Sequence, residues 1–255
     1  MKLKFINTNI TSNEHWKKCN TYVITAKIEV LNNVCLKIDD NTNILLLNNS
    51  LSSITFNPGS KLFAKKIISF AIDSYDINFN TYVVANTQLN DGWTFFGNNK
   101  SKFRIKEFKG SFLGSSQFNA ISINDVEKNK LKIDIIKLND CVNNINLNNS
   151  YLKIKEIKIY NGTNGFNLNN SFLNIKNKFN VTLITLGNLI YESLNTNILI
   201  NKHAYFSLVA MNTQPDIQNV VFRSADTRVN GAIPPYNLTN INKLKDSLNI
   251  TIIAP

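Results

Sequence analysis

The sequence has little cysteine, and its cysteines are not spaced for a structural framework. Cys19, Cys35 and Cys141 are an odd set, and no two of them form a C-x-x-C spacing. A disulfide network and a structural zinc site both need paired or clustered cysteines, so we expect neither. Cys35 and Cys141 stand among apolar residues and are predicted to be small core side chains.

Long apolar runs are also missing. No segment approaches the ~20 apolar residues of a membrane-spanning helix, and stretches such as "NILLLNN" and "KKIISFAI" are far shorter. The opening segment "MKLKFINTNITSN" lacks the apolar core of a signal peptide. We therefore expect no membrane span and no export signal, and a protein that starts out in the reducing cytoplasm of the producing cell.

The motifs of common enzyme classes are absent as well. With nine glycines, the chain has neither a Walker phosphate loop nor a G-x-G-x-x-G segment. Its two histidines, His15 and His203, have no Ser, Cys or Asp partner in a recognisable motif, which argues against a nucleophilic triad. The sequence thus predicts no catalytic residue, no cofactor-binding residue, no cofactor and no metal ligand.

Acidic residues are outnumbered by basic ones, 17 to 28, which gives a net charge of +11. This charge permits an anionic partner such as nucleic acid, a lipid headgroup or an acidic glycan. Arginine, which fits phosphates and base edges, occurs only at Arg104, Arg223 and Arg228. The lysines mostly alternate with apolar residues, as on a solvated strand face. We therefore expect such a face rather than a nucleic-acid groove.

The carboxylates bear on two kinds of site, one for glycan cleavage and one for calcium. A polysaccharide lyase or hydrolase needs clustered carboxylates. Asp39 and Asp40, beside Asn41 and Asn43, predict either a solvated corner or an oxygen-ligand calcium site, and the corner is the simpler interpretation. Asp125 and Asp134 would serve an enzyme only if folding brought them together. The acidic candidates are Asp39, Asp40, Asp73, Asp76, Asp125, Asp134 and Asp140.

A repeat is the strongest positive feature of the sequence. "NINLNNSYLKIK" (Asn144–Lys155) matches "GFNLNNSFLNIK" (Gly165–Lys176) position by position, and "LNNS" also occurs at Leu47–Ser50. A period of about 20 residues with short apolar segments is typical of a β-solenoid or a leucine-rich repeat. The leucine-rich frame is missing here, so we favour the solenoid.

Within each repeat the apolar residues alternate with the period of a strand. Three short strands joined by polar corners and wrapped around a narrow apolar core would form an all-β, right-handed parallel β-helix. We expect about 21–25 residues per coil and about eight to ten coils. The positions predicted to be inward or half-buried near the start are Val23, Ile28, Val30, Val34, Leu36, Ile38, Ile44 and Leu46.

The "LNNS" segments are predicted to form the corners. Asparagine is enriched at positive φ, which a sharp corner requires. Asparagines stacked in successive coils can also hydrogen-bond amide to amide along the axis. We therefore expect a structural role for these residues and no binding role.

The two ends depart from the repeat. Thr11 and Glu14 have a capping-box spacing that predicts a helical turn, and we expect residues 1–20 to cover the open strand edge of the first coil. Residues 21–210 are assigned to the β-helix. Residues 211–255 are predicted to form a second cap or an oligomerisation tail, with a Pro-Pro loop, a short helix over about 240–248 and a last strand.

The segment "YVITAKIEVLNNVCLKIDDNTNI" (residues 22–44) resembles the entry coil of right-handed parallel β-helix proteins of the pectate-lyase-like type. The resemblance covers roughly residues 20–210 and rests on pattern, without a family-defining motif. Such proteins include polysaccharide lyases and hydrolases, phage tailspikes, viral surface proteins and adhesins. The resemblance implies a fold and a range of functions.

Three functional hypotheses follow. The first is a non-enzymatic structural or attachment protein, a virion component such as a tail, fibre or minor capsid protein, whose partners would be other virion proteins, further copies of itself or a surface glycan. The second is a polysaccharide lyase or hydrolase of the β-helix type. The third is a basic scaffold that binds an anionic polymer.

Overall fold

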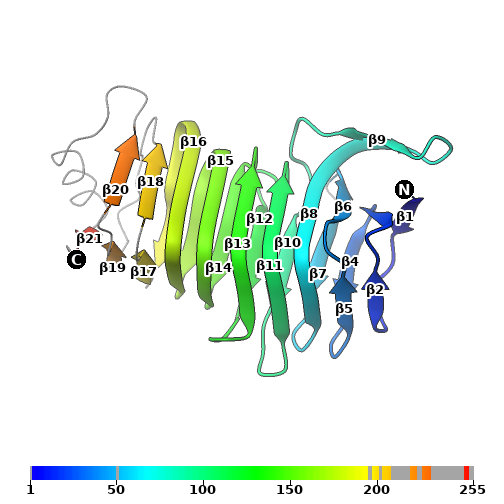
Figure 1. Ribbon diagram of the computed structural model, residues 1–255, viewed down its shortest axis with the longest axis horizontal. Helices are drawn as coiled ribbons and strands as arrows, with labels where there is room; N and C mark the ends of the chain where they lie inside the picture. The colour runs from blue at the N-terminus through cyan, green and yellow to red at the C-terminus, as the bar shows by residue number, and fades with distance from the viewer. Residues whose placement is uncertain are drawn as a thin grey trace.

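The structure, a computed structural model, describes the backbone of residues 2–49, 52–194, 197–200, 203–207, 219–222, 226–230 and 250–252, and side chains as far as Lys178. Up to Lys178 the chain forms a parallel β-solenoid of about seven turns, in which each turn adds one strand to each of three sheets (Figure 1). Within the described ranges there is no helix. The predicted all-β parallel solenoid is therefore confirmed.

Sheet A contains the first strand of each coil. It consists of β1 (Lys2–Ile6), β3 (Asn20–Ile24), β6 (Thr42–Leu47), the middle or later parts of β8 (Lys61–Asp76), β11 (Lys102–Ser111), β13 (Leu131–Asn139), β15 (Tyr151–Asn169) and β16 (Phe172–Leu194), and then β18 (His203–Ser207) and β20 (Asp226–Asn230).

Sheets B and C contain the second and third strands. Sheet B consists of β4 (Lys27–Val30), β7 (Ser53–Phe56), β10 (Trp93–Phe96), β12 (Asn119–Asn124), β14 (Asn143–Asn148) and the last parts of β15 and β16. Sheet C consists of β2 (Glu14–Trp16), β5 (Cys35–Ile38), the first parts of β8, β11, β13, β15 and β16, and then β17 (Asn197–Ile200), β19 (Asn219–Phe222) and β21 (Ile250–Ile252).

The coil length varies more than the sequence predicts. The register predicted for the repeat is confirmed, since Leu147 pairs with Leu168 and Ile154 with Ile175. The coils on either side of β11 are longer, because Phe103 pairs with Leu131 on one side and with Leu62 on the other, whereas the first coil is shorter, since Lys2 pairs with Asn20. The longest coil, between Leu62 and Phe103, contains an inserted hairpin between sheets A and B.

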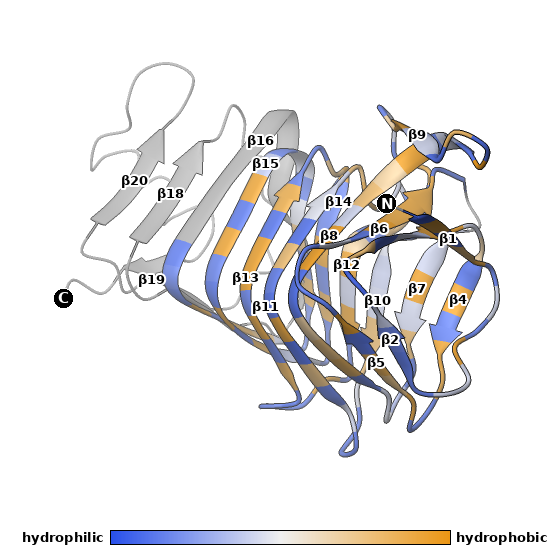
Figure 2. Cartoon of the chain, turned by 45° about the vertical axis from the view of Figure 1, so that its right-hand side comes forward, coloured by the Kyte–Doolittle hydropathy of each residue, from blue (hydrophilic) through white to orange (hydrophobic). Residues whose placement is uncertain are grey.

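The core lies inside the three sheets, where alternate side chains meet. Figure 2 shows the resulting hydrophobic and hydrophilic bands along β11, β13 and β15. Aromatic rings stack from coil to coil, as between Phe56 and Phe95, whose centroids lie 5.2 Å apart. The predicted positions that join this main core are Ile28, Val30, Val34, Leu36, Ile38, Ile44 and Leu46. Val23 is also fully buried, but it belongs to a second cluster outside sheet A.

The corner between sheets B and C is built as predicted. Asn149 and Asn170 have φ of 49° and 45°, and Asp125 occupies the same corner one coil earlier with φ of 54°. The Asn149 amide donates to Oδ1 of Asp125 at 2.9 Å, and the Asn169 amide donates to Oδ1 of Asn148 at 3.1 Å. These side chains form a ladder along the axis, so the structural role predicted for the two later "LNNS" segments is confirmed.

The first "LNNS" segment lies at a different corner. Leu47 ends β6 in sheet A, and Asn48 follows at the corner between sheets A and B. The Asn48 amide donates to Asp73 and Thr87, and its oxygen accepts a hydrogen bond from the backbone N–H of Leu89. The first segment, as far as Asn49, therefore forms a corner as predicted, but not the corner of the two later segments, because the tetrapeptide fits any corner that needs compact polar side chains.

A hairpin from the fourth coil covers the N-terminal end of sheet A. The end of β8 and β9 (Thr81–Val84) pair antiparallel and project toward β1 in Figure 1. Their side chains cover a second apolar cluster, in which Leu3, Val23, Leu45 and Ile72 are buried and Phe5, Leu47, Phe70, Tyr75 and Tyr82 are partly buried. Oδ1 of Asn80 accepts a hydrogen bond from the Leu3 N–H, 2.8 Å away, at the first strand of the stack.

The ends of the chain follow the prediction only in part. The helical turn expected from Thr11 and Glu14 is wrong, since Glu14 begins strand β2 and residues 1–20 provide first-coil strands of the solenoid. The helix expected over about 240–248 lies outside the described residues. The last strand, β21, pairs parallel with β19 and continues sheet C. The boundaries at 20 and 210 stay predictions.

The outer face of sheet A carries lysines that are paired with glutamates. The Glu107 carboxylate lies 2.5 Å from Lys137 Nζ and 4.0 Å from Lys109 Nζ, and Glu156 lies 3.2 Å from Lys158. Burial raises the pKa of Glu107, but the hydrogen bond from Lys137 and the surrounding positive charges outweigh burial and lower that pKa below its ordinary value.

We expect substitution of Asn149 to destabilise the fold. Asn149→Ala places an alanine in the left-handed region and removes the hydrogen bond to Asp125, which should cost about 1–2 kcal/mol of unfolding free energy. Asn149→Gly keeps the backbone conformation and should cost less. Chemical denaturation checks both variants, and equal losses would show that the conformation at this corner does not matter.

Glu107→Gln should alter the acid dependence of stability. Because the folded-state pKa of Glu107 is lowered, the carboxylate stabilises the fold above its unfolded pKa of ~4.3, and this contribution is lost as pH falls through the folded value. The difference in melting temperature between the native protein and the variant should therefore be larger at neutral pH than in acid. The exposed Glu127→Gln is the control, and a pH-independent difference at Glu107 would contradict the assignment.

Candidate anion-binding face

The three outer faces of the solenoid differ in charge. Sheet A carries the paired lysines and glutamates described above. Sheet B presents a neutral polar row in consecutive coils, made of Thr55, Thr94, Ser122, Asn146 and Asn167. Sheet C presents lysines, and its outer face is the candidate functional site.

The sheet C face is defined by side chains that point outward from consecutive strands. In its central row Lys37 pairs with Phe63, Phe63 with Arg104, and Arg104 with Lys132. Lys153 continues the row in the next coil and lines the same depression as Lys132. We call this surface the lysine face, and its cations are Lys37, Lys61, Lys65, Lys102, Arg104, Lys106, Lys132, Lys153, Lys155 and Lys176.

The lysine face holds an excess of uncompensated positive charge. Of its lysines, Lys155 forms an ion pair, with Asp134 at 3.1 Å. The others form no ion pair with any residue whose side chain the structure describes. Strand neighbours in adjacent coils lie ~4.8 Å apart, so like charges are held closer than a Debye length of ~8 Å at physiological salt. A polyanion would relieve this repulsion.

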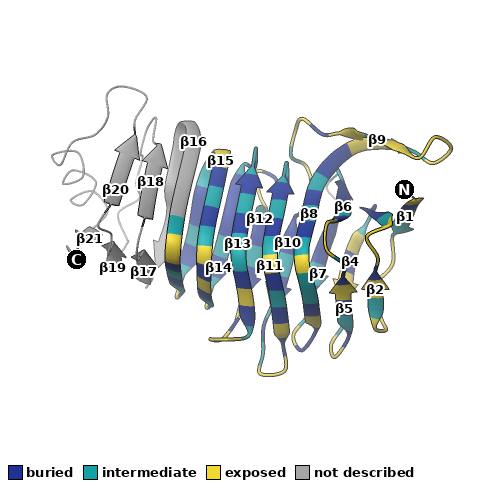
Figure 3. Cartoon of the chain, in the orientation of Figure 1, coloured by how far each residue is buried: buried dark blue, intermediate teal, exposed yellow. Residues whose placement is uncertain are grey.

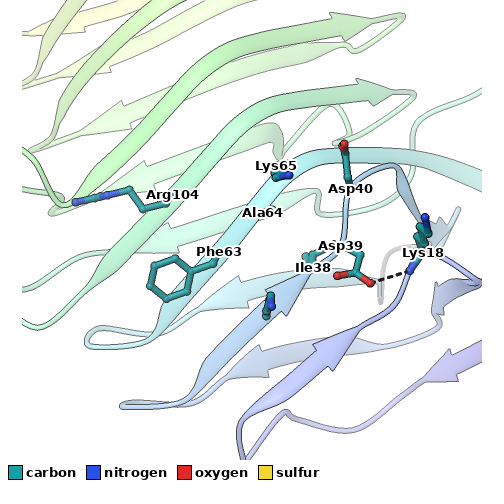
Figure 4. Close-up of a pocket in the computed structure, with 9 residues that line it drawn as sticks. Lys18, Ile38, Asp39, Asp40, Phe63, Ala64, Lys65 and Arg104 are labelled. Carbon is teal, nitrogen blue, oxygen red and sulfur yellow. Dashed lines mark hydrogen bonds between the residues drawn. The ribbon is translucent and has the colours of Figure 1, made fainter.

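Two depressions mark the face, one on each side of Arg104. The first, of about 560 Å³, is lined by Lys37, Asp39, Phe63 and Lys65 among others (Figure 4). The second, of about 330 Å³, is lined by residues that include Lys132, Lys153, Lys155, Lys176 and Tyr151. Arg104 borders both depressions, which follow one another along the sheet.

The guanidinium of Arg104 is already engaged by the protein. Its Nη1 donates to the carbonyls of Phe103 and Lys130, each at 2.9 Å, and its Nη2 donates to the carbonyl of Asn129 at 3.0 Å. These hydrogen bonds connect β11 to the corner that precedes β13. Arg104 therefore adds charge to the face but has few donors left for a fork-like contact with a phosphate.

The aromatic rings of this face are half-buried and lie near other rings or lysine ammonium groups. Tyr151 and Phe172 stack on each other with centroids 4.9 Å apart, and Lys128 Nζ lies 5.7 Å from the Tyr151 centroid. Lys102 Nζ lies 5.6 Å from the centroid of Phe63. Such contacts hold lysines in place by cation–π attraction. The rings therefore help to position the cations of the face.

Apart from the neighbours Asp39 and Asp40, the carboxylates singled out in the sequence have separate places in the fold. Asp125 stands at the corner between sheets B and C, bonded to Asn149, whereas Asp134 follows the sheet C segment of β13 and pairs with Lys155. Asp140 is at the corner between sheets A and B, where it accepts from Asn161.

Asp73 accepts from Asn48 beside the hairpin, and Asp76 accepts from two backbone amides in the hairpin turn. Each of these carboxylates thus serves a corner, a turn or an ion pair.

Asp39 forms a local contact at the edge of the lysine face. Its Oδ1 lies 2.7 Å from His15 Nε2, and its Oδ2 accepts from the backbone N–H of Lys18 at 3.4 Å. The hydrogen bond to His15 is the main cause of a lowered pKa for Asp39. Asp40 is exposed at the same corner. No group of three or more metal-ligating side chains occurs among the described residues.

The cysteine predictions were half correct. Cys141 is buried, and burial raises the pKa of its thiol to about 12. Cys35 is only partly buried, because it points outward from sheet C beside Lys61. The side chain of His203 lies outside the described side chains.

From the sequence, the lysines are predicted to be scattered over a solvated face. In the structure, many of them lie together on the outer face of sheet C instead. The available signal was positional: outward strand positions of sheet C carry lysine coil after coil, whereas those of sheet B carry threonine, serine and asparagine. This pattern can be detected only when it is known which residues pair between coils of unequal length.

In the part of the chain that the structure describes, no helix is long and apolar enough to cross a membrane. Comparisons with protein-family models, with curated proteins and with solved structures found no match to this chain.

Proposed function

We propose that this protein is a non-enzymatic binding module that holds a linear acidic polysaccharide along its lysine face. The observation that carries the proposal is the row of unpaired lysines on consecutive coils of one sheet. An extended polymer with a regular series of carboxylate or sulfate groups matches such a row in both charge and shape.

The scaffold favours this kind of binding. Hydrogen-bonded strands fix the backbone of every coil, so the cations are already aligned before the ligand arrives, and less ordering entropy is lost on binding. Two like charges ~4 Å apart in water repel by about 1 kcal/mol, and neutralisation by the polymer removes that repulsion.

A polysaccharide fits the face better than nucleic acid does. Single-stranded nucleic acids are bound largely by stacking bases on aromatic rings, and the half-buried rings of Phe63 and Tyr151 each already have a lysine ammonium 5.6 and 5.7 Å from the centroid, respectively. The arginine of the face directs its guanidinium to backbone carbonyls. Lysine ammonium groups, which act as point charges, suffice for carboxylates and sulfates spaced along a chain.

Binding without cleavage is supported by the separate positions of the carboxylates. Asp125 and Asp134 flank the sheet C segment of their coil, each with its own partner. With these separate partners, Asp125 and Asp134 are not arranged as a pair that acts as acid and base on one glycosidic bond.

The same activity would suit an attachment role. A rigid solenoid that binds an acidic surface glycan has the properties expected of a virion tail, fibre or minor capsid protein of the pectate-lyase-like type. That setting stays a prediction, and a mass-spectrometric inventory of purified virus particles tests it. Absence of the protein from the particles would exclude the virion setting and leave the glycan proposal standing.

Removal of two lysines from the face should weaken polymer binding. Lys132→Ala with Lys153→Ala should lower the affinity for heparin or polygalacturonate about tenfold at low salt, since two charge contacts of up to ~1 kcal/mol each are lost. The matched control, Lys137→Ala with Lys158→Ala, changes the same two coils and the same net charge on the face of sheet A, and should have little effect. Isothermal titration calorimetry compares the variants.

Three results would contradict the proposal. Equal losses in both double variants would mean that the net charge binds the polymer without a defined face. Binding of single-stranded DNA in preference to both polysaccharides would assign the face to nucleic acid. New reducing ends or unsaturated products after incubation would make the protein an enzyme.

A further inference from the structure

The exposed apolar side chains of the described chain gather at one edge of the solenoid, away from the lysine face. Five of them belong to the hairpin of β8 and β9 and the loop after it, and the others follow sheet A in later coils. Figure 3 shows the exposed hairpin beyond the buried bands of the solenoid. The exposed fractions are 66% for Ile77, 78% for Phe79, 58% for Val83, 50% for Val84 and 55% for Leu89, with Phe118 at 43% and Tyr160 at 39%.

This region is also free of positive charge. From Ile67 through Asn99 the chain contains no lysine and no arginine, although it has 28 such residues in total. The charged residues within that range are Asp73, Asp76 and Asp91. The hairpin is therefore the place where two copies of a protein with a net charge of +11 can approach each other with least repulsion.

The hairpin also presents a strand edge. β9 pairs with β8 along one side, and no other described strand pairs with it. Its sequence, Thr-Tyr-Val-Val, has high β propensity and no charge, proline or glycine. An uncharged edge of this kind is a template for pairing with another strand, and folded proteins normally protect such edges.

We propose that β9 is a self-association strand, which pairs antiparallel with β9 of a second copy of this chain across a two-fold axis. Antiparallel pairing of identical strands is self-complementary, as an isologous interface requires. The pairing would extend the β8–β9 hairpin into a four-stranded sheet across the two copies. Val83, Val84 and Phe79 would become buried at the same time.

A second copy fits this edge better than a membrane does. Hairpins that insert apolar tips into anionic lipid usually combine them with basic neighbours, whereas the charges on this segment are acidic. A second copy needs no opposite charge, since both partners bring the same neutral strand. The proposal does not depend on polysaccharide binding, because the lysine face is formed by a different sheet.

Measurement of molar mass in solution tests the inference. Light scattering after size exclusion, over a concentration series, should give twice the chain mass for the native protein. Val83→Lys adds a charge at the centre of the pairing edge and should return the mass to that of one chain. Tyr160→Lys, which adds the same charge at an exposed aromatic position outside the hairpin, is the matched control and should leave the dimer intact.

Hydrogen exchange gives a second readout on the unaltered protein. Amides of residues 81–84 should become more protected as the concentration rises, while those of exposed corners such as Asn149 should not change. A native protein that stays monomeric, a dimer that survives Val83→Lys, a dimer lost in Tyr160→Lys, or concentration-independent exchange at β9 would each overturn the proposal. Higher oligomers, or binding of the monomer to uncharged phosphatidylcholine vesicles, would overturn it as well.

Discussion

Hydrogen bonding between successive coils is the constraint on which the rest of this structure depends. Because each strand pairs in parallel with the equivalent strand one coil away, a side chain lies directly over its counterpart in the next coil. Where successive coils carry like residues at equivalent positions, these residues stack on one another. The phenylalanines of the core, the asparagines of the corners and the lysines of sheet C are three chemical results of this one backbone arrangement.

The same stacking has opposite energetic consequences for different side chains. Stacked rings such as Phe56 and Phe95 and stacked amides such as Asn148 and Asn169 attract each other. Stacked ammonium groups repel, and on sheet A the repulsion is offset by glutamates between the lysines. On sheet C the described lysines mostly lack such partners. Charge that is left uncompensated on a rigid face is the basis of the functional proposal.

Much of the fold could be predicted from the sequence because strand periodicity and the "LNNS" repeat depend on local pattern. The core positions from Ile28 to Leu46 and the corner asparagines Asn149 and Asn170 follow directly from that pattern. The lysine face could not be predicted, because coils of unequal length hide which lysines align. The hairpin was missed for a related reason: β9 covers strands from the very start of the chain, as the bond from Leu3 to Asn80 shows. Short-range periodicity contains no information about such contacts.

The position of the covering hairpin in the chain has a consequence for biosynthesis. Leu3, Val23 and Leu45 leave the ribosome well before the strands that shield them, which end only at Val84. Until that segment emerges, the nascent N-terminal coils expose an apolar patch, so a chaperone that binds exposed apolar segments would find its target there. The apolar patch on the first coils is therefore covered only after the hairpin of the fourth coil has been synthesised.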